Sequence, residues 1–125
     1  MNTIIGGAGI YSCSGCSTGR KVGYVGNNSG AIQFNNINVQ NTDTYTLIIY
    51  YCSGETRYAL MNIDDAPGMK LTFSSTGSFD TPGPLTVSIK LNSGSNTIKF
   101  YNPSGWAPDF ERIVVTSPSQ GGNYL

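Results

Sequence analysis

Residues 85–91 read LTVSIKL, and they alternate strictly between apolar and polar side chains. Successive side chains of an extended strand point to opposite faces, so the four apolar residues share one face and the three polar residues share the other. This period of two is typical of a strand with one buried and one solvated face, as in antiparallel sheets. Residues 45–52, YTLIIYYC, are apolar on both faces, so we expect this strand to lie centrally in a sheet.

The rest of the chain shows the same organisation, with short runs of β-branched and aromatic residues separated by turn-forming segments such as NNSG and DDAPG. No window carries a helical period of apolar residues longer than two turns. The expected strands are residues 3–10, 21–25, 31–39, 44–52, 56–63, 69–73, 85–91, 97–101 and 110–116. This spacing predicts an all-β fold, an antiparallel β-sandwich of jelly-roll type.

The length of 125 residues predicts one domain. We assign residues 1–116 to the sandwich and residues 117–125, SPSQGGNYL, to a tail or linker remnant, because this segment carries no strand pattern.

Charge and composition limit the partners of the protein. Seven basic and seven acidic residues cancel, which argues against a nucleic acid or an anionic membrane surface as the partner. No apolar run reaches the roughly 20 residues needed to cross a bilayer, and the start MNTIIGGAGI lacks the regions of a signal peptide. Few charges and many Gly, Ser, Thr and Asn residues are typical of extracellular β-proteins, so we predict a secreted or extracellular protein.

The three cysteines are Cys13, Cys16 and Cys52. The segment CSGC favours a local bridge between Cys13 and Cys16, and a bridge from either one to Cys52 is the alternative. Three cysteines without any histidine do not make the usual four-ligand zinc site. A thioredoxin-like role needs CxxC at the start of a helix, and no helical period follows here.

The absence of histidine excludes the Ser-His and Cys-His nucleophile pairs. Two carboxylates about 5 to 9 Å apart would still suffice for a glycosidase. The sequence is better suited to sugar binding without catalysis, because aromatic and hydrogen-bonding residues occur in loops and at strand ends. The candidate ligand-binding residues are Tyr24, Arg57, Phe79, Trp106 and Asp109. A ring covers the apolar face of a sugar, Asp accepts from its hydroxyls and Arg donates to them.

Each of these side chains also has a purely structural explanation, which the sequence leaves open. Tyr24 fits a core position, Phe79 a cover over a sheet end and Trp106 a packed loop anchor. Arg57 fits a surface ion pair with Glu55.

The order of several segments resembles carbohydrate-binding modules of family 35 and, more distantly, of family 6. The segments that carry the resemblance are TYTLIIYY, the TGSF turn, the strand-turn-strand LNSGSNTIKF and the closing PDFERIVV, within residues 4–116. The resemblance implies a galactose-binding-domain-like jelly roll that lacks catalysis, is attached to a glycoside hydrolase, and binds sugar in the loops at one end.

The resemblance also implies roles for individual residues. Tyr24 takes the place of the family's site tyrosine, Arg57 that of its hydroxyl- or carboxylate-binding arginine, and Asp109 a polar site position, while Phe79 and Trp106 fall on loops near the same end. This combination resembles the branch attached to galactan- and galactoside-degrading enzymes, which implies galactose-containing glycans such as β-1,3-galactan. An acidic side chain at residue 109 would repel a uronic acid, which favours neutral galactose.

The family's structural calcium is held by an acid of the last strand together with an N-terminal Glu-x-Glu strand. Glu111 takes the position of the last-strand acid, but this chain has no Glu-x-Glu segment at its start, and one carboxylate cannot supply six to eight oxygens. We therefore expect no required cofactor, and Glu111 is the one candidate ligand for a structural calcium.

The leading hypothesis is a non-catalytic, galactose-specific carbohydrate-binding module whose partner is a glycan. A free-standing galactose-specific lectin and a small glycosidase that uses loop carboxylates are the alternatives.

Overall fold

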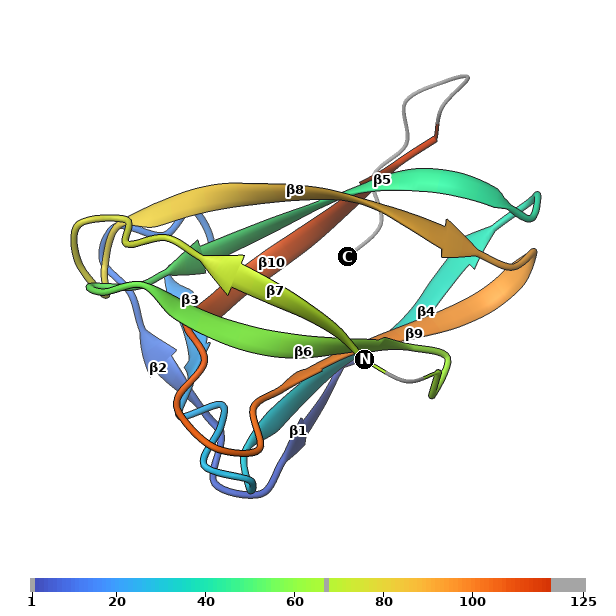
Figure 1. Ribbon diagram of the computed structural model, residues 1–125. Helices are drawn as coiled ribbons and strands as arrows, with labels where there is room; N and C mark the ends of the chain where they lie inside the picture. Colours follow the sequence, from blue (N-terminus) through green and yellow to red (C-terminus); the bar gives the residue numbers. More distant parts are fainter. Residues whose placement is uncertain (1, 67, 118–125) are drawn as a thin grey trace.

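The computed structural model describes residues 2–66 and 68–117, which form ten strands and no helix. The strands make two five-stranded sheets that pack face to face (Figure 1). The first sheet has the order β1 (Thr3–Ile5), β4 (Ala31–Val39), β9 (Gly94–Tyr101), β6 (Arg57–Ile63), β7 (Met69–Phe73). The second has the order β2 (Gly9–Ser12), β3 (Arg20–Gly23), β10 (Asp109–Thr116), β5 (Asp43–Cys52), β8 (Pro82–Leu91).

All neighbouring strands pair antiparallel, so the predicted antiparallel β-sandwich of jelly-roll type is confirmed. In the described part of the chain there is no helix that is long and apolar enough to cross a bilayer. The strands end at Thr116, and residues 118–125 of the predicted tail lie outside the described residues.

Strand β5 lies between β10 and β8, as the sequence predicts for the apolar run 45–52. The alternation of LTVSIKL is also confirmed, because Leu85, Val87, Ile89 and Leu91 are less exposed than the polar residues between them. Strand β8 begins three residues before the expected start, at Pro82. A proline there is tolerated because β8 is the edge strand of its sheet.

The predicted single strand 3–10 is wrong. The structure divides it into β1 and β2, which belong to different sheets. Gly6 has a φ of 62°, and a Cβ at this position would lie 2.2 Å from the carbonyl oxygen of Ser29. Only glycine combines this left-handed backbone with such a close approach, so the chain turns here from one sheet to the other.

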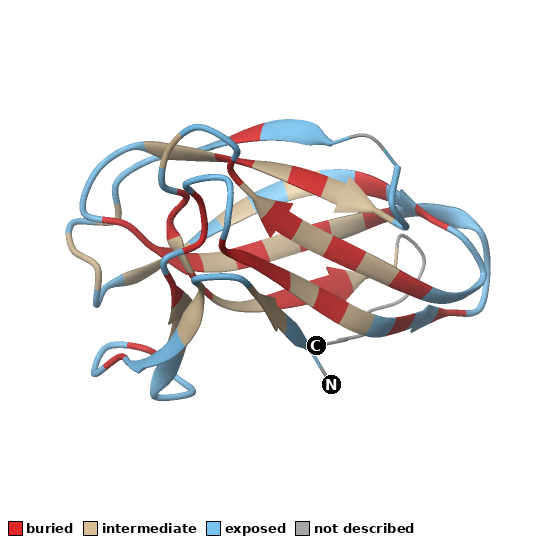
Figure 2. Cartoon of the chain, turned by 90° about the horizontal axis from the view of Figure 1, so that it is seen from below, coloured by how far each residue is buried: buried red, intermediate tan, exposed pale blue. Residues whose placement is uncertain are grey.

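The core is built around a series of contacting aromatic rings. Phe34 meets Phe100 edge to face at 6.1 Å between ring centroids, Phe100 stacks on Phe110 at 4.7 Å, and Phe110 meets Phe73 at 5.7 Å. Phe73 in turn contacts Tyr51 at 4.9 Å. The three phenylalanines other than Phe110 come from the first sheet, whereas Phe110 and Tyr51 come from the second. These rings therefore join the two sheets, and buried and less buried residues alternate along β5, β7 and β9 (Figure 2).

Replacing Phe100 by alanine should lower the free energy of unfolding by about 3–5 kcal/mol, because a fully buried ring in contact with both sheets is lost. Urea unfolding followed by circular dichroism measures the change. The control Thr86→Ala, at an exposed position of β8, should change stability by less than about 0.5 kcal/mol. Similar losses in both variants would contradict this account of the core.

Candidate functional site

A pocket of about 460 Å³ is lined by residues of β2, β3, β6 and β10 and of the loops next to them. The labels of β2 and β3 mark this end of the sandwich in Figure 1. The volume of the pocket is within the range of small-molecule binding sites. The described residues that line it are Tyr11, Ser12, Lys21, Gly23, Tyr24, Arg57, Phe79, Trp106 and Asp109. The structure thus brings all five candidate residues predicted from the sequence together around one cavity, although they come from β6, β10 and three separate loops.

One wall of the pocket consists of three aromatic rings in contact. Tyr24 meets Tyr11 at 5.4 Å and Trp106 at 5.8 Å between ring centroids, both edge to face. The three residues keep between 43% and 58% of their surface exposed, so Tyr24 is not a core residue. Exposed apolar groups that gather at a cavity are typical of binding surfaces.

Backbone hydrogen bonds between two loops hold this wall in place. The Asn27 N–H donates to the Gly105 carbonyl at 2.8 Å, and the Ala107 N–H donates to the Val25 carbonyl at 2.8 Å. A Cβ at Gly26 would lie 2.3 Å from the Gly105 oxygen, so the two loops approach this closely only with glycine at position 26. Tyr24 and Trp106, which lie next to these contacts, are therefore fixed by paired backbone.

A second wall is formed by Arg57 and Phe79, which contact each other. The guanidinium of Arg57 lies 4.6 Å from the centroid of the Phe79 ring, a cation–π contact. Its Nε donates to a carboxylate oxygen of Glu55 at 2.9 Å, and its Nη1 donates to the Ala107 carbonyl at 3.2 Å. The surface pair with Glu55 that the sequence left open is thus present, and it holds Arg57 in an ordered position beside the pocket.

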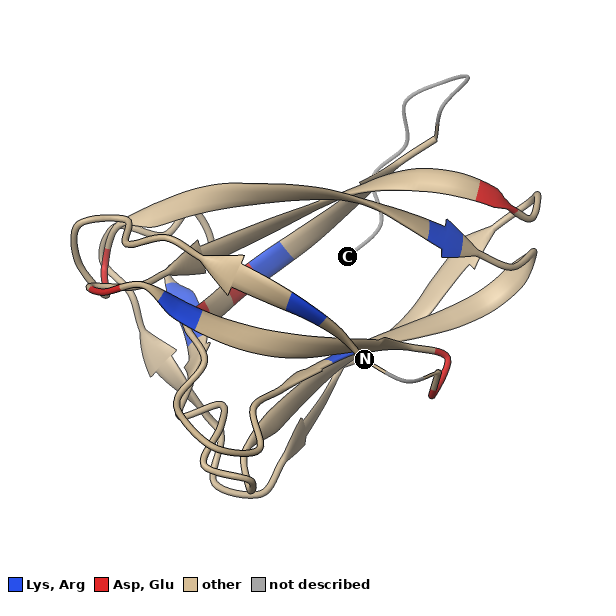
Figure 3. Cartoon of the chain, viewed as in Figure 1, with Lys and Arg blue, Asp and Glu red and all other residues tan. Residues whose placement is uncertain are grey.

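An ion pair connects the two walls. Lys21 Nζ lies 2.9 Å from Asp109 Oδ2, and the two side chains are only 10% and 14% exposed. Lys21 also donates to the Phe79 carbonyl and lies 3.7 Å from the more exposed Asp80. Burial lowers the pKa of Lys21, but the hydrogen bond and charge of Asp109 and the charge of Asp80 raise it overall. Figure 3 shows basic and acidic positions gathered at this end of the molecule.

Sequence reasoning missed Lys21, Tyr11 and Ser12. Tyr11 and Lys21 are paired across the β2–β3 hairpin. Gly23 is the last residue of β3, and a Cβ added to it would lie 3.3 Å from Asp109 Oδ1. The KVG segment is not distinctive in sequence. Recognition of these residues requires the pairing of β3 with β10, which is a non-local contact.

Glu111 does not line the pocket. Its side chain is only 2% exposed, and its Oε2 accepts hydrogen bonds from Ser17 Oγ at 2.8 Å and from the backbone and hydroxyl of Thr18 at 3.2 Å. It anchors the loop between β2 and β3. A calcium ion needs six to eight oxygen ligands, and the only described cluster of potential metal-ligating side chains is the three cysteines. Glu111 therefore belongs to no described group of three such side chains.

The local disulfide favoured by the CSGC segment is confirmed, because Cys13 is bonded to Cys16. Cys52 is buried and carries a free thiol. The alternative bridge to Cys52 is not the one present.

The lining side chains offer contact surfaces for a ligand. Asp109 is the one carboxylate among the described lining residues, and it is already paired with Lys21. A glycosidase needs two carboxylates on either side of the bond to be cleaved. The exposed rings, the guanidinium and the carboxylate can instead contact a polar ligand that has an apolar face.

Replacing Lys21 by methionine should lower the free energy of unfolding by about 2–3 kcal/mol, because the largely buried Asp109 carboxylate loses its charged partner. Thermal or urea unfolding measures the loss. Lys90→Met, at an exposed position of β8, is the matched control and should be nearly neutral.

The difference between wild type and Lys21→Met should also depend on pH. The pKa of Lys21 is raised above its ordinary value of 10.5, so the stabilisation is fully present below pH 10.5 and is lost as the pH rises through the raised pKa. The two proteins should therefore converge in stability at strongly alkaline pH. A difference that stays constant across this range would show that the ion pair is not its cause.

Comparisons with known proteins agree on the fold. No protein-family model and no curated protein sequence matches the chain. Its structure matches a family 35 carbohydrate-binding module from Clostridium thermocellum with a TM-score of 0.90 and 28% identity, over 93% of this chain and 92% of that chain. A family 35 module from Paenibacillus barcinonensis matches with a TM-score of 0.82 and 23% identity, over 94% and 98%.

A larger protein also contains this fold. An exo-β-1,3-galactanase from Phanerochaete chrysosporium, in a structure with galactose, matches with a TM-score of 0.86 and 27% identity. The match covers 91% of this chain and 27% of the galactanase chain. The resemblance predicted from the sequence is thus confirmed: the chain has the fold of family 35 carbohydrate-binding modules over almost its whole length.

Proposed function

We propose that this protein is a non-catalytic carbohydrate-binding module that binds galactose-containing glycans in the pocket between the aromatic wall and Arg57. The likeness to family 35 modules supports the carbohydrate-binding role. The observation that carries the proposal is the convergence of three exposed rings, one guanidinium and one carboxylate on one cavity.

The pocket has the two kinds of surface that a sugar needs. A pyranose ring has an apolar C–H face and a periphery of hydroxyl groups. Tyr24 and Trp106 offer exposed ring surface to the C–H face, and Asp109 accepts hydrogen bonds from hydroxyls. Arg57 donates to the sugar oxygens.

A neutral sugar suits the charges of the site better than an anionic one. Both cations among the described lining residues are already paired, Lys21 with Asp109 and Arg57 with Glu55. A carboxylate on the ligand would therefore meet no unpaired cation, and it would lie close to the negative charge of Asp109. This argument favours galactose over a uronic acid.

Two further observations support galactose. In galactose the axial hydroxyl at C4 leaves one ring face as a continuous C–H surface, which matches an aromatic wall. The galactanase that shares this fold acts, by its name, on β-1,3-galactan. Because its chain is much longer than this one, we propose that the module serves an attached glycoside hydrolase domain outside the cell.

Calorimetric titration with β-1,3-galactotriose should give a dissociation constant in the millimolar to micromolar range, which corresponds to a binding free energy of about 4–8 kcal/mol. Arg57→Ala and Trp106→Ala should each weaken binding roughly tenfold or more, which corresponds to about 1.4 kcal/mol. Arg20→Ala changes an exposed arginine outside the pocket and should leave binding unchanged.

The matched ligands are a β-1,3-linked glucose trisaccharide and glucuronic acid, which should bind more weakly. If another glycan on an array binds and galactosides do not, the proposed specificity for galactose is wrong. Release of reducing sugar that is lost in Asp109→Asn would indicate a glycosidase instead. Agglutination of red cells by a purified oligomer would indicate a free-standing lectin, since a monomer with one site cannot cross-link cells.

A further inference from the structure

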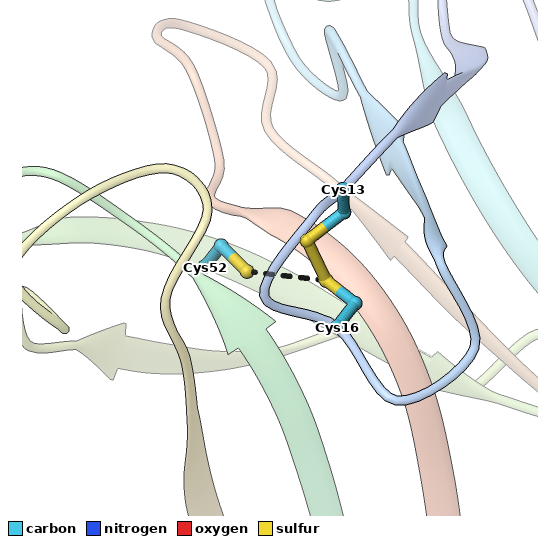
Figure 4. Close-up of side chains that lie close together, drawn as sticks. All are labelled: Cys13, Cys16 and Cys52. Atoms are coloured by element: carbon cyan, nitrogen blue, oxygen red, sulfur yellow. Dashed lines mark hydrogen bonds between the residues drawn. A yellow bond between two sulfur atoms is a disulfide. The ribbon is translucent and has the colours of Figure 1, made fainter.

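The three cysteines form one buried cluster (Figure 4). Cys13 and Cys16 lie in the loop between β2 and β3, and Cys52 is the last residue of β5. The three sulfur atoms lie within 4.8 Å of one another, and the Sγ of Cys52 is 3.7 Å from that of Cys16. A free thiol thus contacts one sulfur of the disulfide.

The cluster sits between the elements that carry the pocket. Cys13 follows Ser12, which lines the cavity, and its Sγ is 3.9 Å from the carbonyl oxygen of Asp80. Cys52 is the register partner of Asp109 in the pairing of β5 with β10. Rearrangement of the sulfur bonds would therefore act on the support of both walls.

We propose that Cys52 can replace Cys13 as the disulfide partner of Cys16, so that this fold supports two disulfide isomers. In the exchange, the Cys52 thiol loses its proton and its sulfur attacks Sγ of Cys16. A Cys16–Cys52 bond forms, the Cys13–Cys16 bond breaks, and its electron pair leaves on Sγ of Cys13, which takes up a proton. No oxidant or reductant is consumed, because one disulfide replaces another.

Two features make this exchange slow at neutral pH. The Cys52 sulfur contacts the disulfide from the side in Figure 4, whereas attack needs the three sulfurs in line, so the Cys13–Cys16 loop must shift. Burial also raises the pKa of Cys52 to about 11, against the opposing effect of Lys21 on β3. Asp109 and Glu111 on β10 and Asp80 in its loop raise it further. Alkaline pH should therefore speed the exchange.

The second isomer differs in what it connects. The present bridge joins residues three apart inside one loop, whereas Cys16 and Cys52 are 36 residues apart. The new bridge would join the loop of the β2–β3 hairpin covalently to β5, a central strand of the sheet. It closes a longer loop, so it should stabilise the fold more than the local bridge does.

Peptide mapping by mass spectrometry tests the proposal. The variant Cys13→Ser is refolded in a mixture of reduced and oxidised glutathione. Oxidation of its two thiols to a disulfide is balanced by reduction of one glutathione disulfide to two glutathione thiols. We expect a Cys16–Cys52 linked peptide in most molecules and a higher Tm than in the same variant after reduction. If Cys13→Ser folds and both remaining cysteines are alkylated as free thiols, the proposal is wrong.

Wild-type protein provides the second measurement, which does not depend on the folding of a variant. After incubation at about pH 10 and acid quench, the linked Cys16–Cys52 peptide should be roughly tenfold or more above its amount at about pH 7. Free Cys13 should appear in equal measure. Absence of the linked Cys16–Cys52 peptide would overturn the proposal. Equal labelling of Cys13 in the Cys52→Ser control would also overturn it, because the disulfide would then open by another route.

Discussion

The stacking of Phe100 on Phe110 joins the two sheets, and it also fixes the strand on which the pocket depends. Phe110 begins β10 together with Asp109, which points into the pocket, and it is followed by Glu111 at a bulge in the pairing with β5. Bulges re-aim side chains next to functional sites. The bulge directs Glu111 to the loop before β3. Three successive residues thus have different roles: Asp109 lines the pocket, Phe110 packs in the core and Glu111 anchors the hairpin loop.

The pocket is ordered before any ligand arrives. Lys21 holds Asp109, and Glu55 together with a backbone carbonyl holds Arg57, so neither charged group has to be fixed during binding. Paired backbone positions the loops of Tyr24 and Trp106 in the same way. The side chains of the site then lose less conformational entropy on binding, and this offsets the small contact area that a single sugar offers.

Local patterns in the sequence determined much of the fold, but not the order of the strands. Alternation revealed strands such as β8, and the apolar run 45–52 revealed a central strand, because burial on one or both faces leaves a direct pattern. Arg57, Asp109 and the loop aromatics were recognisable by type and by the family resemblance. Tyr11 and Lys21 were not, because their role arises only when the β2–β3 hairpin pairs with β10, a contact between distant parts of the chain.

This hairpin is the element on which the order of the site depends most. Strand β2 is an edge strand that pairs only with β3 among the described strands, and Ile10 and Tyr11 on it are exposed. Little apolar burial therefore holds the hairpin against the sandwich. Its position rests on the pairing of β3 with β10 and on polar and sulfur contacts, namely Lys21 with Asp109, the loop hydroxyls with Glu111, and the cysteine cluster. Because Lys21 and Asp109 also line the pocket, ligand affinity and hairpin stability should be coupled properties of this fold.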